Sequence, residues 1–162
     1  MRFPIKGFIR PLLILALVGV APIAALAHEF KVGDLEIVHP WARATLKGSD
    51  VADGFMKIVN HGSTPDKLIA VSVEFAPTVQ IHEMKMDGQV MKMEELKDGL
   101  EIPAGATVEL KPGADHIMFL HVNEQMTPDE MLNGELTFEK AGKVKVEFLV
   151  EPAGTSSSMD MD

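Results

Sequence analysis

Turn-forming residues interrupt this chain about every eight to twelve residues from His28 onward, and no stretch between them keeps a helical hydrophobic period. Short apolar segments divided in this way are typical of an antiparallel β-sandwich or barrel. Pro40 lacks the backbone N–H that a strand ladder needs, so the first strand is expected to end there. The expected strands cover about residues 35–39, 54–59, 66–73, 82–86, 89–93, 99–102, 107–110, 116–122, 135–139 and 144–150.

The first 27 residues have the layout of a secretory signal peptide. Three basic residues are followed by an apolar run from Pro11 to Ala27, which is short for a membrane-spanning helix and ends in the small residues Ala25-Leu26-Ala27. We therefore expect cleavage after Ala27 and export to the periplasm. No cysteine follows the apolar run, so a lipid-anchored form is not expected.

Cleavage would leave 162 − 27 = 135 residues, which is enough for one domain and too few for two. That domain is expected to span residues 28–152, and the small, polar and acidic stretch 153–162 should be a disordered tail. The formal net charge of −9 becomes −12 without the three basic residues of the leader. An acidic protein of this kind is poorly suited to nucleic acid or to anionic membrane surfaces.

A methionine-rich stretch is centred on Asp87-Gly88, where four of the eleven methionines lie within ten residues. Asp-Gly is a strong signal for a two-residue hairpin turn. With Asp87 and Gly88 at the centre, Met84 would lie opposite Met91, and His82 opposite Met93. Glu83 would face Lys92 on the other side. Because side chains alternate between faces, one face would carry His82, Met84, Met86, Met91 and Met93.

Thioether sulfur beside imidazole nitrogen is the donor set that a monovalent copper ion prefers. The alternative is that the methionines fill irregular gaps in the core. A metal site is favoured because the hairpin's other face is charged and the methionine face has no Leu, Ile or Val. His116 and Met118 are two residues apart and share a face of a later strand.

The chain resembles the periplasmic copper chaperone family PCu(A)C over nearly all of its length after the leader. His82 and Met93 are eleven residues apart, and Met93 and His116 are twenty-three apart. Shorter matches are Gly33-Asp34-Leu35, His39-Pro40-Trp41-Ala42-Arg43, His82-Glu83-Met84, Ile102-Pro103-Ala104-Gly105 and Leu110-Lys111-Pro112-Gly113. The resemblance implies a cupredoxin-like Greek-key barrel or sandwich that binds Cu(I) through His82, Met93, His116 and Met118. It also implies copper delivery towards the Cu(A) centre of cytochrome c oxidase, with subunit II or a Sco-type thiol protein as acceptor.

Several further residues are accessory candidates. Met84, Met86 and Met91 could be alternative ligands, an entry path or a docking surface, or could simply pack. A second, weaker copper site, which could take Cu(II), could form at His28 or at Met159 and Met161. His39, His61 and His121 have no methionine in register and are expected to be structural or exposed.

Other functions agree with the sequence to different degrees, and a copper scavenging or resistance role stays open. A scavenging or resistance protein without a dedicated acceptor would need the same ligands. A cupredoxin electron carrier needs a cysteine thiolate, and the chain has no cysteine. An immunoglobulin-like interaction module would use the methionines as core. No enzyme is expected, because neither a hydrolase triad context nor a phosphate-binding loop is present.

Overall fold

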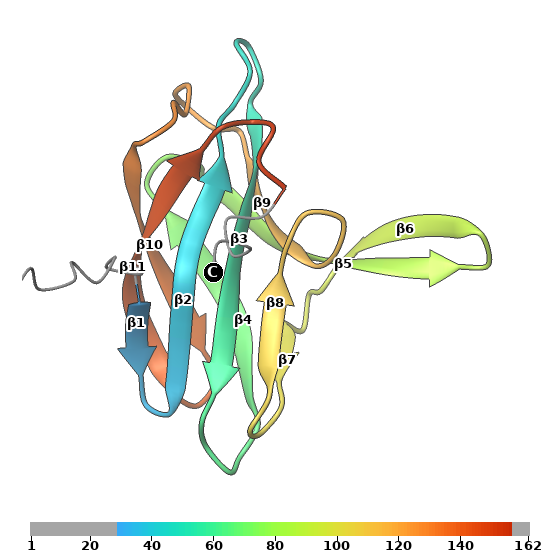
Figure 1. Cartoon of the computed structure of the whole chain (residues 1–162), viewed down its shortest axis with the longest axis vertical. Coiled ribbons are helices and arrows are strands. Elements are labelled where there is room, and N and C mark those ends of the chain that lie inside the picture. Colours follow the sequence, from blue (N-terminus) through green and yellow to red (C-terminus); the bar gives the residue numbers. More distant parts are fainter. Residues whose placement is uncertain (1–28, 157–162) are drawn as a thin grey trace, which may run out of the picture.

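The computed structural model describes residues 29–156, and all regular structure in this range is β-strand (Figure 1). None of these residues forms a helix long and apolar enough to cross a membrane. The expected signal peptide, His28, Met159 and Met161 lie outside the described residues. The strands are β1 (Glu29–Val32), β2 (Leu35–Arg43), β3 (Val51–Asn60), β4 (Asp66–Val73), β5 (Thr78–Asp87), β6 (Val90–Glu95), β7 (Leu100–Ile102), β8 (Thr107–Leu110), β9 (His116–Leu120), β10 (Met131–Phe138) and β11 (Gly142–Glu151).

The strands form one hydrogen-bonded path in the order β6-β5-β9-β3-β2-β11-β10-β4-β7, with β1 added beside β2 and β8 beside β3. Every pairing is antiparallel except that of β11 with β2. The path folds over itself, so that β2 and β3 lie in front of β4 and β10 in Figure 1. The expected all-β sandwich is confirmed. The barrel alternative is not, since the described pairings leave β6 and β7 as open ends of the path.

The core lies between the two layers and is organised around Phe119, which is fully buried. The Phe119 ring meets Phe75 and Phe148 edge-on, with centroids 5.0 Å and 5.6 Å away. β11 shows the alternation expected from the sequence from Val144 to Val150, because Val146, Phe148 and Val150 are buried and the residues between them, Glu147 and Leu149, are exposed or half-buried. Such edge-to-face pairs add to the stabilisation from apolar burial.

β2 continues through Pro40, so the expected end of the first strand is wrong. His39 has a φ of +48°, and the pairing with β3 shifts register between Val38 and Trp41. This bulge removes Pro40 from the ladder, where its missing N–H would have broken a hydrogen bond. Pairing resumes with Trp41 opposite Phe55. The bulge therefore places Trp41 and Arg43 on an outer face of the sheet.

Asp66 ties the start of β4 to the β10–β11 turn. Its carboxylate accepts hydrogen bonds from the backbone N–H groups of Lys67 (2.7 Å), Lys140 (2.9 Å) and Ala141 (2.8 Å). Burial acts to raise the pKa of Asp66, but the three N–H donors and the Lys140 charge outweigh it, so the pKa lies below its ordinary value.

Replacing Asp66 should therefore destabilise the fold. In Asp66→Ala three backbone N–H groups lose a charged acceptor, and we expect the free energy of unfolding to fall by about 1.5–3 kcal/mol in urea titrations. Asp98→Ala, at an exposed turn position, should change it by less than about 0.5 kcal/mol. Equal effects of the two substitutions would contradict the role assigned to Asp66.

Candidate metal centre

β5 positions the candidate site because it is longer than its partner β9. The two strands pair from Thr78 opposite Leu120 to His82 opposite His116. β9 begins at His116, so beyond His82 the only ladder partner of β5 is β6. The β5–β6 ribbon consequently projects from the sandwich (Figure 1), and the two histidines lie where the ribbon leaves it.

The register of the ribbon differs from the one expected from Asp87-Gly88. Asp87 pairs with Val90, so Gly88 and Gln89 are the central turn residues, and Gly88 has a φ of +65°. A glycine at the first central position is the type II′ pattern, whereas the prediction placed Asp87 and Gly88 at the two central positions. The observed pairs are His82 with Glu95, Glu83 with Glu94, Met84 with Met93, Lys85 with Lys92, and Met86 with Met91.

The face assignment survives this correction, because the partner of each residue moves by two positions. His82, Met84, Met86, Met91 and Met93 still share a face. The expected Glu83–Lys92 charge pair does not form. Instead the Glu83 carboxylate forms an ion pair with Lys85, and the Lys92 ammonium forms an ion pair with Asp87.

The side chains of His82 and His116 are buried, with exposed fractions of 7% and 9%, and their ring centroids are 5.5 Å apart. His116 Nδ1 donates a hydrogen bond to the Ala114 carbonyl at 2.9 Å, which leaves the Nε2 lone pair free. His82 Nε2 donates to Gln80 Oε1 at 2.9 Å, which leaves the Nδ1 lone pair free. His82 Nδ1 is buried and has no hydrogen-bond partner among the described residues. A buried lone pair without a partner is costly unless a ligand or ion uses it, so both imidazoles suit metal coordination.

The charge state of His82 also suits a ligand. Burial lowers the pKa of His82, and repulsion from a protonated His116 lowers it further. The carboxylates of Glu95 and Asp53 act in the opposite direction without cancelling these effects. The His82 imidazole is therefore neutral at physiological pH, and the same two carboxylates favour a cation beside it.

The thioethers come together in a pocket of about 220 Å³ on the outer face of β3, β9 and β5. Asp53 lies opposite Met118, and Met118 lies opposite Gln80, so the three strands present one row of side chains to this face. The backbone N–H of Met84 donates to Asp115 Oδ1 at 3.2 Å and fixes the base of the ribbon to the turn before β9. The pocket is lined by Met84, Met93, His116 and Met118 together with Arg43, Asp53, Phe55, Pro112 and Gly113.

Three of the four ligands implied by the family resemblance, namely Met93, His116 and Met118, thus line one pocket. His82 does not line it, but its ring lies next to that of His116. Met84 also lines the pocket, although sequence spacing had placed it only among the accessory candidates. The hairpin register could have identified Met84 as a candidate ligand, because the correct turn type places Met84 directly opposite Met93.

An aromatic pair lies beside the pocket, which one of its two rings, Phe55, lines. Trp41 and Phe55 are both buried, with ring centroids 4.4 Å apart. The Arg43 guanidinium lies 5.4 Å from the centroid of the Phe55 ring and 3.8 Å from the Asp53 carboxylate. Arg43 also donates to the carbonyl of Thr155 at 3.1 Å. Arg43, Asp53 and Phe55 line the pocket, and Trp41 packs against Phe55.

The other three histidines within residues 29–156 do not line the pocket. His39 contacts Glu151 at 2.9 Å, His61 contacts Glu36, and His121 contacts Asp50 at 3.7 Å. These contacts agree with the structural or exposed roles expected for them.

Core packing is wrong as an explanation for the ribbon methionines. Met86, Met91 and Met93 are 58%, 52% and 48% exposed, whereas the methionines that do fill the core are Met56 and Met126. No group of three or more His, Cys, Asp or Glu side chains within residues 29–156 is placed to hold a metal ion. A metal bound at this site must therefore accept thioether ligands, which favours Cu(I) over hard cations.

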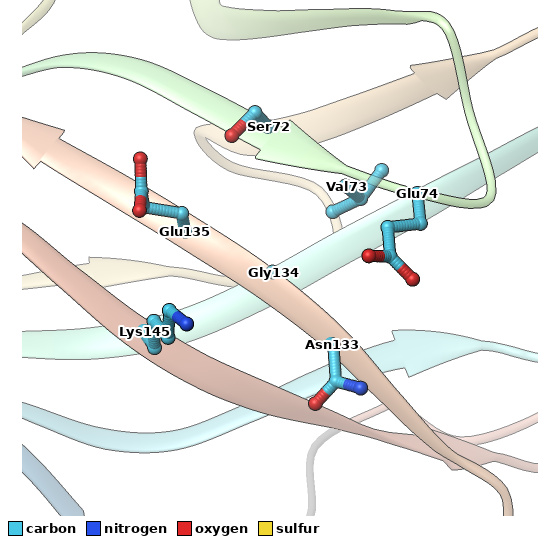
Figure 2. A pocket seen from close by; sticks show the side chains of 7 residues that line it. All are labelled: Ser72, Val73, Glu74, Asn133, Gly134, Glu135 and Lys145. Atoms are coloured by element: carbon cyan, nitrogen blue, oxygen red, sulfur yellow. The ribbon is translucent and has the colours of Figure 1, made fainter.

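A second cavity, of about 450 Å³, is on a different surface, beside β4, β10 and β11. Figure 2 shows Glu74, Asn133 and Lys145 around its rim, with Ser72 and Glu135 on neighbouring strands. Glu135 is paired with Lys143 at 2.7 Å. The residues that line this cavity include no histidine or methionine, so it does not compete with the pocket on β3, β9 and β5 as a copper site.

The family model described as "Putative lipoprotein LpqE-like" matches residues 35–150. The copper-bound PCuAC domain from PmoF2 is 31% identical, with a TM-score of 0.67, and the match covers 77% of this chain and 98% of that domain. A protein of Leifsonia xyli subsp. xyli described as a putative lipoprotein is 27% identical over 129 residues, which is 78% of this chain and 76% of that protein.

The solution structure of Cu(I)-DR1885 from Deinococcus radiodurans is 20% identical, with a TM-score of 0.61, and the match covers 78% of this chain and 83% of that one. At this identity the likeness concerns the fold alone. Together with the PmoF2 domain it confirms the expected cupredoxin-like β-sandwich.

Replacing His82 should weaken the pH dependence of stability in the copper-free protein. Below the ordinary histidine pKa of 6.5 the unfolded chain binds a proton at His82 that the native protein does not, so the free energy of unfolding falls as pH decreases towards the native pKa. His82→Gln should remove this contribution, and Met93→Leu, in the same pocket, should retain it. Urea titrations from pH 7.5 to pH 5, a range of about 2.5 pH units around the ordinary histidine pKa, measure how steeply the free energy of unfolding changes with pH. Equal slopes for wild type and His82→Gln would contradict the prediction.

Proposed function

We propose that this chain, which belongs to the LpqE-like family and contains a PCuAC domain, is a copper chaperone. It binds one Cu(I) ion at the β5–β6–β9 pocket and transfers it. The proposed ligands are His82, Met93, His116 and Met118, with Met84 as a further thioether at the same pocket. The observation that carries the proposal is a pocket lined by three methionines and His116, with the His82 ring 5.5 Å from that of His116 and a free lone pair on each imidazole.

The donor set supports Cu(I) as the cargo. Thioethers and neutral imidazoles are soft or intermediate ligands without negative charge, so they favour the monovalent ion. In an oxidising compartment cysteine ligands would be liable to disulfide formation, whereas a His and Met set avoids this. The signal-like leader and the lipoprotein description of the family support a place in the cell envelope, and we propose the periplasm.

Exposure of the pocket supports transfer rather than storage. Met93 is about half exposed on a ribbon that projects from the domain, so a partner can reach the ion and exchange ligands one at a time. A thiolate acceptor would draw Cu(I) from thioethers because it is the stronger soft ligand. We propose delivery towards the Cu(A) centre of cytochrome c oxidase, through subunit II or a Sco-type thiol protein. No catalytic activity is proposed.

Cu(I) titration against a competing chelator under anaerobic conditions tests the ligand set. The native protein should take up one equivalent with high affinity, and Met93→Leu and His116→Ala should each weaken binding by at least about 10- to 100-fold, the range seen when groups supporting a metal site are lost. The matched substitutions Met131→Leu and His121→Ala remove an exposed methionine and an exposed histidine elsewhere, and should leave affinity unchanged.

Thermal unfolding gives an independent readout, because an ion that binds only the native state stabilises it, by about 2.7 kcal/mol at a free concentration 100 times the Kd. Absence of Cu(I) uptake by the native protein would overturn the proposed function. Unchanged affinity in both Met93→Leu and His116→Ala would overturn the ligand assignment.

A scavenging or resistance role without a dedicated acceptor is the competing function. A deletion strain separates the two. A chaperone predicts loss of cytochrome c oxidase activity at limiting copper and recovery at excess copper. A scavenger predicts normal oxidase activity and greater sensitivity to excess copper.

A further inference from the structure

The β5–β6 ribbon carries two thioethers that the pocket does not use. Met86 and Met91 are directly opposite one another near the tip, and they share a face with the next pair inward, Met84 and Met93. The inner pair lines the pocket, whereas the outer pair does not. The face therefore presents two successive pairs of sulfur donors that lead from the tip to the pocket.

Packing does not explain the outer pair. Met86 and Met91 are each more than half exposed, and at this point β5 has no ladder neighbour other than β6. An isolated two-stranded ribbon has no core of its own to fill. The opposite face of the same ribbon carries charged residues that pair with one another, namely Glu83 with Lys85 and Lys92 with Asp87.

The spacing suits an ion shared between the two side chains. Directly opposite residues in an antiparallel pair have Cβ atoms about 4.5–5.5 Å apart, and the unbranched methionine side chain can turn its sulfur towards its partner. Successive pairs on one face are separated by two residues, or about 7 Å along the strand. An ion held at the outer pair is thus within one side-chain length of the inner pair.

Building on the proposed copper function, we propose that Met86 and Met91 form a second, weaker Cu(I) position, coordinated by thioethers alone, through which the ion enters and leaves the pocket. Passage to the pocket is ligand exchange: the bonds from copper to the outer sulfurs break as bonds to the sulfurs of Met84 and Met93 form, and His116 then adds a nitrogen donor. Copper stays in the monovalent state, and no proton is transferred because thioethers carry none.

The chemistry gives the two positions a definite order. The outer pair offers two neutral sulfurs in an exposed place, whereas the pocket adds imidazole donors in a partly buried one. The first Cu(I) equivalent should therefore occupy the pocket, and the outer pair should fill only when more Cu(I) is supplied. Loss of the outer pair should therefore change the rates of Cu(I) loading and unloading more than it changes the affinity of the pocket for Cu(I).

Methionine methyl groups labelled with ¹³C allow both positions to be followed by NMR as Cu(I) is added anaerobically. The first equivalent should shift the methyl signals of Met93 and Met118, and the second should shift those of Met86 and Met91. The Met131 methyl signal, from an exposed methionine on β10, is the internal control and should not move. A second equivalent that leaves Met86 and Met91 unshifted would overturn the outer position.

The double substitution Met86→Leu with Met91→Leu keeps size and hydrophobicity and removes only the sulfurs. It should retain one high-affinity equivalent and slow the removal of Cu(I) by a soluble chelator by about tenfold or more, the low end of what loss of a metal-site group costs. Met131→Leu should behave as wild type. Rates unchanged by the double substitution would overturn the relay and indicate apolar docking only. Failure of the native protein to take up even the first equivalent would instead count against the proposed function.

Discussion

The site depends on a mismatch in strand length between β5 and β9. Because β9 starts at His116, β5 changes its ladder partner at His82, pairing with β9 before this residue and with β6 beyond it. Up to that point the strand is part of a packed sheet, and beyond it only a two-stranded ribbon remains. The two histidines therefore belong to the rigid part of the protein and the methionines of the ribbon to its exposed part. Imidazoles fixed by the sheet and thioethers exposed to solvent would allow the proposed chaperone both to hold an ion and to release it.

The sandwich gives the site its rigidity. Phe119, in the centre of the core, and Met118, at the pocket, are neighbours on β9 that point to opposite faces, so core packing also fixes the face of the strand that carries the proposed ligand Met118. On the outer face, the buried rings of Trp41 and Phe55 pack against each other. Arg43 lies beside the Phe55 ring, forms an ion pair with Asp53 and donates a hydrogen bond to the Thr155 carbonyl. The bulge at His39 and Pro40 is what brings Trp41 into register with Phe55. A deviation in β2 that sequence reasoning treated as a strand end is therefore part of the support of the pocket.

The sequence was sufficient for the fold class and for the face on which the methionines lie, because both depend on periodicity alone. It was insufficient for the hairpin register, which depends on whether Asp87 or Gln89 accompanies Gly88 at the turn. That choice moved Met84 opposite Met93 and took His82 away from it. The short strand β1 was not expected, and β3 and β10 are longer than expected, since strand ends are fixed by neighbouring strands rather than by local sequence. The free ring nitrogens of His82 and His116 depend on Gln80 and Ala114, and spacing carries no information about them.

The central claim is that one Cu(I) ion is held by sulfur and nitrogen together on the outer face of β3, β9 and β5. X-ray absorption at the copper K-edge of the protein loaded with a single equivalent measures this directly. We predict the edge shape of monovalent copper and a first coordination shell that contains both thioether sulfur and imidazole nitrogen, with the sulfur contribution reduced in Met93→Leu and the nitrogen contribution reduced in His116→Ala. A first shell of oxygen and nitrogen without sulfur would contradict the account.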